Sequence, residues 1–181
     1  MIFNPFENRL CRDIRNDLGH GFVKAVAAND ITPFYTALLP YQSKTTMDHI
    51  STYIRHRKTC LEIIFKHLGA GPVQPDDNRL IPLFLWNLEL FFEFHEWLEQ
   101  KWTTAQGNKK KALQALILAA VTYEQLEYGR KIPAKKVASK AVLLFKEHGN
   151  LIPAVFDADA FILKLKALDP VPPKFIRPDK I

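Results

Sequence analysis

A histidine and two glutamates in one aromatic-rich stretch are the residues best suited to chemistry in this sequence. His95 and Glu99 stand four residues apart, with Glu96 beside the histidine, in the segment FFEFHEWLEQKW. On a helix, residues four apart lie on the same face and can touch. A helical wheel places His95 and Glu99 in an apolar arc, so we expect them to be buried together, where polar groups need partners.

This spacing resembles the helix of zinc proteases, with Glu99 in place of the second histidine. In that helix the histidines hold Zn²⁺ and the glutamate acts as base. One hypothesis is therefore a metal-dependent hydrolase, with His95 and Glu99 as candidate ligands of a divalent metal and with His95, Glu96 and Glu99 as candidate catalytic residues. A second is a structural hydrogen-bond network, and a third is a binding pocket for an organic ligand or a protein.

The following helix supplies further candidates. Glu124 and Glu127 share one arc with several apolar residues of the segment 109–128. If that arc faces the helix before it, both carboxylates can approach the histidine pair, and Trp102 lies on the same face as that pair. The candidate ligand-binding residues are His95, Glu99, Trp102, Glu124 and Glu127.

A weaker metal candidate lies in the segment 45–68. His56 and Cys60 are one helical turn apart and could share an ion. Two ligands without a converging third do not make a site, so a plain helix flank is the competing interpretation.

Positive charge is concentrated in two clusters between residues 109 and 140, and the whole chain carries a net charge of +6. The clusters are Lys109–Lys111 and Arg130–Lys140. They favour either solvated helix faces or an anion-binding surface, including that of a nucleic-acid accessory protein. No recognisable nucleic-acid motif accompanies them.

The composition is that of a globular protein, with 48% hydrophobic residues. Two distant cysteines favour a reducing compartment, so the cytoplasm is the expected location. The most apolar run, residues 81–98, is interrupted by glutamates, which argues against a membrane span.

Hydrophobic periodicity predicts an all-α, mostly antiparallel bundle. A first helix should start at Pro5 and continue to about Asp17 or to Ala28. The helix over 83–103 is apolar on two faces, so we expect it to be central and buried. The predicted division is an N-terminal helical extension over 1–75 packed on the core, a bundle over 76–168 and a Pro-rich extended tail over 169–181. The other helices are predicted between Pro33 and Pro40, over 45–68, 109–128 and 133–148, and from Asp157.

The run FEFHEWLE at 92–99 with Trp102, then QALILAA at 114–120 and LEYG at 126–129, resembles a family of small all-helical bacterial and archaeal proteins known as domain of unknown function 309. The similarity covers about residues 85–148. It implies an antiparallel helical bundle and no established activity, with residues 1–75 as an extension that some members carry. Four residues depart from the family pattern and remove polar partners from any shared pocket: Phe94, Leu118, Gln125 and Arg130.

The leading functional hypothesis from the sequence is a non-enzymatic cytoplasmic protein. It would bind an unknown protein or small-molecule partner near the buried His95 and Glu99 cluster.

Overall fold

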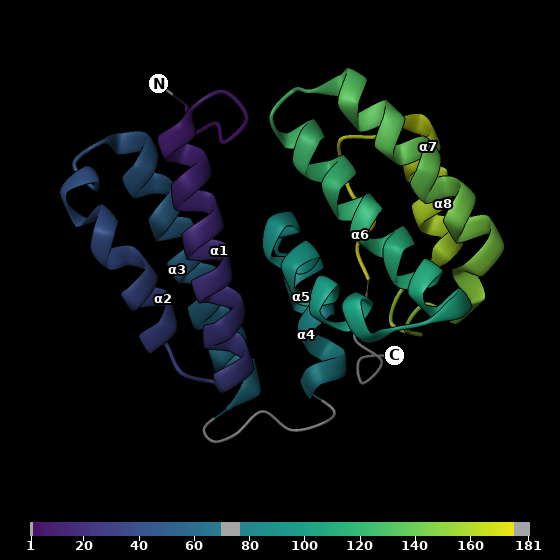
Figure 1. Ribbon diagram of the computed structural model, residues 1–181, viewed down its shortest axis with the longest axis horizontal. Coiled ribbons are helices and arrows are strands. Elements are labelled where there is room, and N and C mark those ends of the chain that lie inside the picture. The colour runs from purple at the N-terminus through teal and green to yellow at the C-terminus, as the bar shows by residue number, and fades with distance from the viewer. Residues whose placement is uncertain (1, 70–76, 176–181) are drawn as a thin grey trace. The chain divides into compact units, whose positions relative to one another are not determined.

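The computed structural model describes residues 2–69 and 77–175 (Figure 1). Over these residues the chain forms eight α-helices, two short 3₁₀ helices and no β-strand, which confirms the predicted all-α fold. The chain divides into two compact units, residues 1–81 and 82–181, with the division inside one helix. The predicted boundary at 75/76 lies outside the described residues.

The first unit is a small helical group, and its first helix begins later than predicted. Asn4 caps only a preceding turn, where its side chain accepts a hydrogen bond from the Phe6 amide. Asn8 is the true cap, because its side chain accepts from the Cys11 amide at 3.1 Å. The elements are α1 (Arg9–Ala28), α2 (Thr32–Leu38), η1 (Leu39–Lys44) and α3 (Asp48–Leu68).

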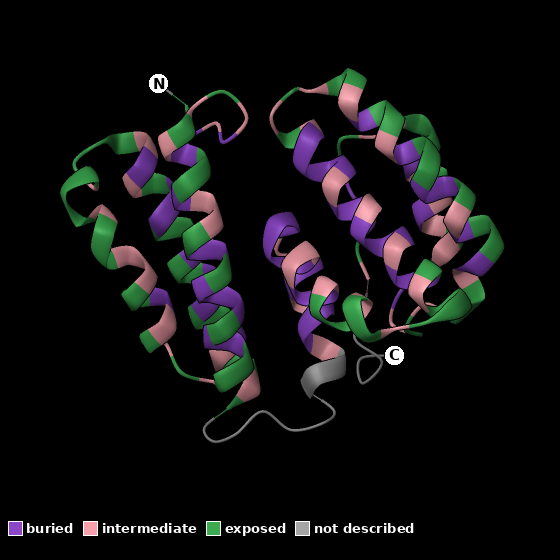
Figure 2. Cartoon of the chain, viewed as in Figure 1, coloured by how far each residue is buried: buried purple, intermediate pink, exposed green. Residues whose placement is uncertain are grey.

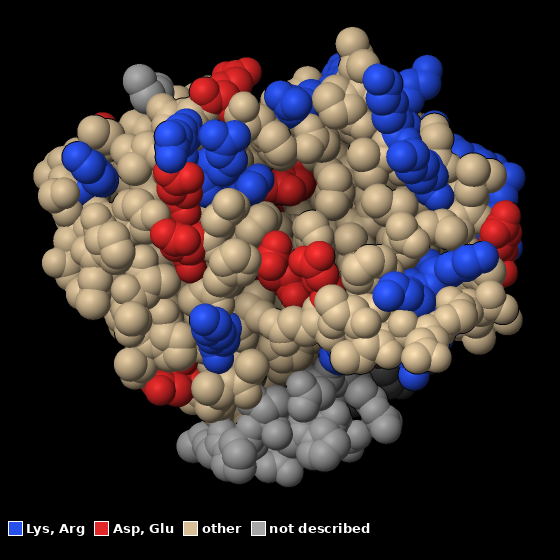
Figure 3. All heavy atoms as spheres, in the orientation of Figure 1, with Lys and Arg blue, Asp and Glu red and all other residues tan. Residues whose placement is uncertain are grey.

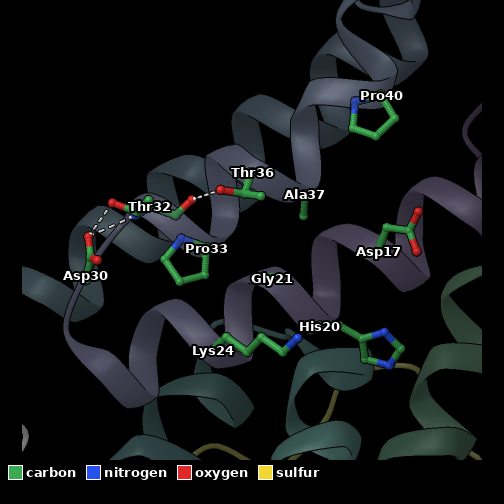
Figure 4. A pocket seen from close by; sticks show the side chains of 10 residues that line it. All are labelled: Asp17, His20, Gly21, Lys24, Asp30, Thr32, Pro33, Thr36, Ala37 and Pro40. Atoms are coloured by element: carbon green, nitrogen blue, oxygen red, sulfur yellow. Dashed lines mark hydrogen bonds between the residues drawn. The ribbon is translucent and has the colours of Figure 1, made fainter.

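A glycine allows α1 and α2 to approach closely. Figure 4 shows Pro33 and Ala37 of α2 opposite Gly21 of α1. A Cβ atom at Gly21 would lie 2.7 Å from the Ala37 Cβ and 2.9 Å from the Pro33 carbonyl oxygen. Any side chain at this position would therefore force the two helices apart.

The second unit is a run of helices in which each packs on the next along the chain. Contacts join α5 to α6, α6 to α7 and α7 to α8. Figure 2 shows α7 with buried residues on one side and exposed residues on the other. The elements are α4 (Asp77–Asn87), which crosses the division between the units, α5 (Phe91–Thr104), α6 (Gly107–Glu127), α7 (Lys131–His148), η2 (Gly149–Leu151) and α8 (Ala158–Ala167).

The predicted continuous helix over 83–103 is wrong, because the chain turns between α4 and α5. Glu89 adopts the left-handed conformation with φ 59°. The Leu90 amide donates to the Leu85 carbonyl at 2.9 Å and the Glu89 amide donates to the Trp86 carbonyl at 3.0 Å, the pattern of a Schellman helix end. The segment contains neither glycine nor proline at this point, so its periodicity suggested no break.

Trp86 is the centre of an aromatic core in the second unit. Its ring is fully buried and lies edge-on to Phe94 at 5.1 Å and to Phe161 at 4.8 Å between centroids. Its Nε1 donates a hydrogen bond to the Pro173 carbonyl at 2.7 Å. The indole is therefore satisfied by a segment that follows it by 87 residues.

The described part of the predicted extended tail, residues 169–175, packs into the core of the second unit. The Asn87 side chain donates to the Phe175 carbonyl at 2.8 Å and accepts from the Phe175 amide at 3.1 Å. The Phe175 ring packs against Phe156 and Phe161 at 5.2 and 5.1 Å between centroids. The rest of the predicted tail, residues 176–181, lies outside the described residues.

Candidate functional site

Helix α5 brings the three central candidate residues together. The Nε2 atom of His95 lies 3.9 Å from an oxygen of Glu99, which confirms the contact predicted from their spacing. One ligand atom from each of His95, Glu96 and Glu99 lies within 4.8 Å of the other two. An imidazole nitrogen and two carboxylate oxygens therefore converge on one side of a single helix.

The expected burial of this pair is wrong. The His95 side chain is 27% exposed and that of Glu99 is 47% exposed. The buried side of α5 is instead centred on Phe94 and Leu98, and the Phe94 ring packs against Trp86 and Phe156. Because α5 is apolar on two faces, the wheel alone could not show which of them is buried.

Glu93 is the buried carboxylate of α5, and sequence reasoning missed it. Its exposed fraction is 0%, although a helical wheel groups it with the polar residues Glu96 and Gln100. On a helix Glu93 lies on the same face as Trp97, one turn later, and Trp97 is also buried. Its position could be inferred only after the inward face of α5 was known.

The two glutamates of α6 lie outside the converging group. Glu124 is buried and Glu127 is exposed. In the described part of the chain, neither belongs to a set of three or more potential metal ligands. Trp102 is half-buried, and the Lys110 ammonium lies 4.2 Å from its ring centroid, so this lysine occupies one face of the indole.

The weaker metal candidate, His56 and Cys60, forms a close pair, and among the described residues the pair does not belong to a group of three or more potential metal ligands. The thiol sulfur of Cys60 lies 3.7 Å from Nε2 of His56. The His56 Nδ1 lies 3.0 Å from a guanidinium nitrogen of Arg57, which can only donate. Nδ1 therefore accepts, the neutral ring carries its proton on Nε2, and that nitrogen is turned to the thiol as a donor. This arrangement favours a hydrogen bond over metal binding.

The first unit has a surface hollow of about 510 Å³ between α1 and α2 (Figure 4). Its wall on α1 carries Asp17, His20 and Lys24 at successive turns. Within the described residues these side chains are not part of a group of three or more converging metal ligands. Asp17 accepts a hydrogen bond from the Tyr41 hydroxyl. Burial, together with this aspartate, raises the pKa of Tyr41 to about 12.

The predicted basic clusters lie at the surface. Lys109 and Lys111 are exposed in the first turn of α6, and the lysines of α7 are exposed along its outer side. Figure 3 shows lysine and arginine side chains gathered over the part of the molecule that contains α7.

None of the helices in residues 2–69 and 77–175 has the length and apolar character that crossing a bilayer requires. No curated protein and no solved structure gives a significant match to the chain. One family model does match, over residues 83–137, and its description is "Domain of unknown function (DUF309)". The matched segment runs from the last turns of α4 through α5 and α6 into α7, and it contains the residues of the converging group. Residues 83–137 are therefore similar to this family, and the matched segment includes His95, Glu96 and Glu99.

Proposed function

We propose that this protein is a non-enzymatic cytoplasmic binding protein, and that the ligand it holds at His95, Glu96 and Glu99 is a divalent transition-metal ion. The observation that carries the proposal is the convergence of three potential ligand atoms within 4.8 Å of one another. An imidazole with two carboxylates suits Zn²⁺ and its first-row neighbours better than Ca²⁺ or Mg²⁺, which prefer oxygen alone.

The geometry needs only small adjustments to close around an ion. Ligand atoms bonded to a tetrahedral or octahedral ion lie roughly 3–4 Å apart, because each metal–ligand bond is about 2 Å. The carboxylates can rotate inward because the Glu99 side chain is 47% exposed and Glu96 is only partly buried. All three ligands come from α5, so the remaining coordination positions are open to water or to a group of a binding partner.

A binding role fits the position of Glu96 better than hydrolysis does. In a zinc-protease helix the glutamate next to the first histidine stays off the metal and acts as a base. Here an oxygen of the Glu96 carboxylate lies within 4.8 Å of the ligand atoms of the other two side chains, which supports a role for it as a third ligand. Hydrolysis would then lack its base on this helix.

Equilibrium dialysis with Zn²⁺ and Co²⁺, on protein from which any affinity tag has been removed, tests the proposal. We expect one ion per chain and a visible Co²⁺ spectrum. His95→Ala and Glu99→Gln should each weaken binding at least about tenfold through loss of a ligand. Binding should also weaken as the pH falls, because protons compete with the ion for its ligands.

Glu62→Gln is the matched control, because Glu62, like Glu99, has a partner side chain four residues before it, Lys58, on a different helix. This variant should bind the ion as the natural protein does. Stoichiometry and affinity that survive His95→Ala would refute the site. Hydrolysis of an activated ester or phosphodiester that needs the ion and is lost in His95→Ala would refute the non-enzymatic role.

A further inference from the structure

The outer face of α7 carries uncompensated positive charge. Its five lysines are all exposed, and the single acid of the helix is Glu147. In the described part of the chain, none of these five lysines makes an ion pair or a hydrogen bond through its side chain. By contrast, Lys164 and Lys174 each bind a carboxylate, at 2.6 and 2.7 Å. The α7 lysines are Lys131, Lys135, Lys136, Lys140 and Lys146.

Two large aliphatic residues stand in the middle of this basic face. Ile132 is 76% exposed and Leu143 is 59% exposed. They are eleven residues apart, which places them within about 20° of each other on the helix and about 16 Å apart along it. Lysines flank them on both sides, with Lys135 on one and Lys136 and Lys140 on the other. The solvent-facing side of α7 therefore carries apolar residues surrounded by positive charge.

Helix α8 packs against α7 and also exposes a leucine and a lysine. Leu163 is 71% exposed and Lys166 is exposed near it on the same helix. A hollow of about 330 Å³ between α7 and α8 is lined by apolar side chains, with Lys135 from one helix and Lys166 from the other among the lining residues. Its other lining residues are Ala138, Ser139, Val142, Leu143, Leu165 and Leu168.

We propose that this α7–α8 face binds peripherally to the surface of a bilayer that contains anionic phospholipids. Exposed leucine and isoleucine with surrounding lysines is the composition of interfacial helices, whose aliphatic residues enter the headgroup region while the cations meet lipid phosphates. A nucleic-acid backbone would match the lysines but would leave Ile132 and Leu143 against a charged, polar surface. An acidic protein would need carboxylates placed for each lysine, whereas a fluid bilayer supplies charge without fixed positions.

Co-sedimentation with lipid vesicles tests this surface on the full chain. We expect binding to vesicles of phosphatidylcholine with phosphatidylglycerol and none to pure phosphatidylcholine. Each of Lys136→Gln and Lys140→Gln should lower the partition constant about fivefold, since a lysine near an anionic surface contributes about that factor. Leu143→Ser should also lower it several-fold through loss of apolar insertion. Because all three side chains are exposed, the variants should fold normally, which circular dichroism can verify.

Lys58→Gln is the control, because it removes the same charge from α3, outside the face. It should leave vesicle binding unchanged. Equal binding to neutral vesicles, no binding to anionic vesicles, or equal loss in Lys58→Gln and Lys136→Gln would overturn the proposal. A duplex DNA arm separates the alternative partner: binding to DNA that exceeds binding to vesicles and is unaffected by Leu143→Ser would assign the face to nucleic acid instead.

Discussion

The ends of α4 and α6 adopt the same backbone turn with very different residues. Gly129 follows α6 with φ 69° and Glu89 follows α4 with φ 59°. In both turns the next amide donates back to a helix carbonyl at 2.9 Å, from Arg130 in one and from Leu90 in the other. Glycine adopts this left-handed conformation freely, whereas a residue with a side chain loses about 1 kcal/mol. The turn at Glu89 must therefore gain stability from contacts elsewhere.

The C-terminal segment supplies those contacts. Lys174 donates through Nζ to the Asn87 carbonyl at 2.8 Å and to a Glu89 carboxylate oxygen at 2.7 Å. The neighbouring Phe175 exchanges two hydrogen bonds with the Asn87 side chain. One turn is thus encoded by the residue that occupies it. The other depends on a segment that lies 85 residues further along the chain.

Removal of the Phe175 ring from this segment should have the largest effect on the difference between the two turns. Phe175→Ala should lower the free energy of unfolding by about 2–3 kcal/mol, because a half-buried ring that packs on Phe156 and Phe161 is lost. Urea unfolding measures the change, and hydrogen exchange at the Leu90 amide should accelerate while exchange at Arg130 stays slower. Leu163→Ala, at a residue 71% exposed, is the control and should change stability by no more than about 0.5 kcal/mol.

An equally small effect of Phe175→Ala would show that the turn at Glu89 is stable without the C-terminal segment. In that case the difference between the two turns would reside in the local sequence after all.

Exchanging the residue types between the two turns should change the stability of the protein in opposite directions. Gly129→Ala should cost about 1 kcal/mol, since alanine is strained at this φ. Glu89→Gly should stabilise the protein by about 0.5 kcal/mol, because relief of strain exceeds the value of an exposed ion pair. Glu89→Ala separates the two contributions, as it keeps the strain and loses the pair. Thermal unfolding of the three variants measures the order, and a destabilised Glu89→Gly would contradict it.

The same contrast explains which helix ends could be predicted from the sequence. Gly69 and Gly129 marked the ends of α3 and α6, and Asp157 marked the start of α8, where its side chain accepts from two backbone amides. Phe156 and Phe161 meet across that start at 6.1 Å between centroids, as expected of a hydrophobic staple. These signals are local. The break at Glu89 carries no local signal, so periodicity extended one helix through it.

In the candidate site, too, the local features could be predicted from the sequence and the long-range ones could not. The contact between His95 and Glu99 follows from helix geometry, which needs only their spacing. Their exposure depends on which side of α5 is buried, and that side is chosen by Trp86 and Phe156, which belong to other elements. The sequence could therefore predict which residues meet on α5 but not which of its carboxylates is buried.

The smallest expected effect is at the end of α8. There a single carboxylate, in place of a glycine, stabilises the left-handed turn. Leu168 adopts φ 48°, and the following residue, Asp169, binds the Lys164 ammonium at 2.6 Å and accepts from the Val171 amide at 2.9 Å. The hydrogen bond from Lys164 and then that from the Val171 amide lower the pKa of Asp169. The folded protein therefore keeps this carboxylate charged at a pH where the unfolded chain has begun to protonate it.

A lowered pKa means that the contribution of Asp169 is complete above about pH 5 and is lost as the pH falls through the folded-state value. Asp169→Asn should therefore be slightly less stable than the natural protein at neutral pH, and the difference should shrink steadily toward pH 3. Urea unfolding of both proteins at several pH values measures this difference. The contributions of the other carboxylates to stability are the same in both proteins and cancel. A difference that is constant with pH would mean that the turn at Leu168 is held by its backbone bonds alone, and that only the turn at Glu89 depends on a side chain for its stability.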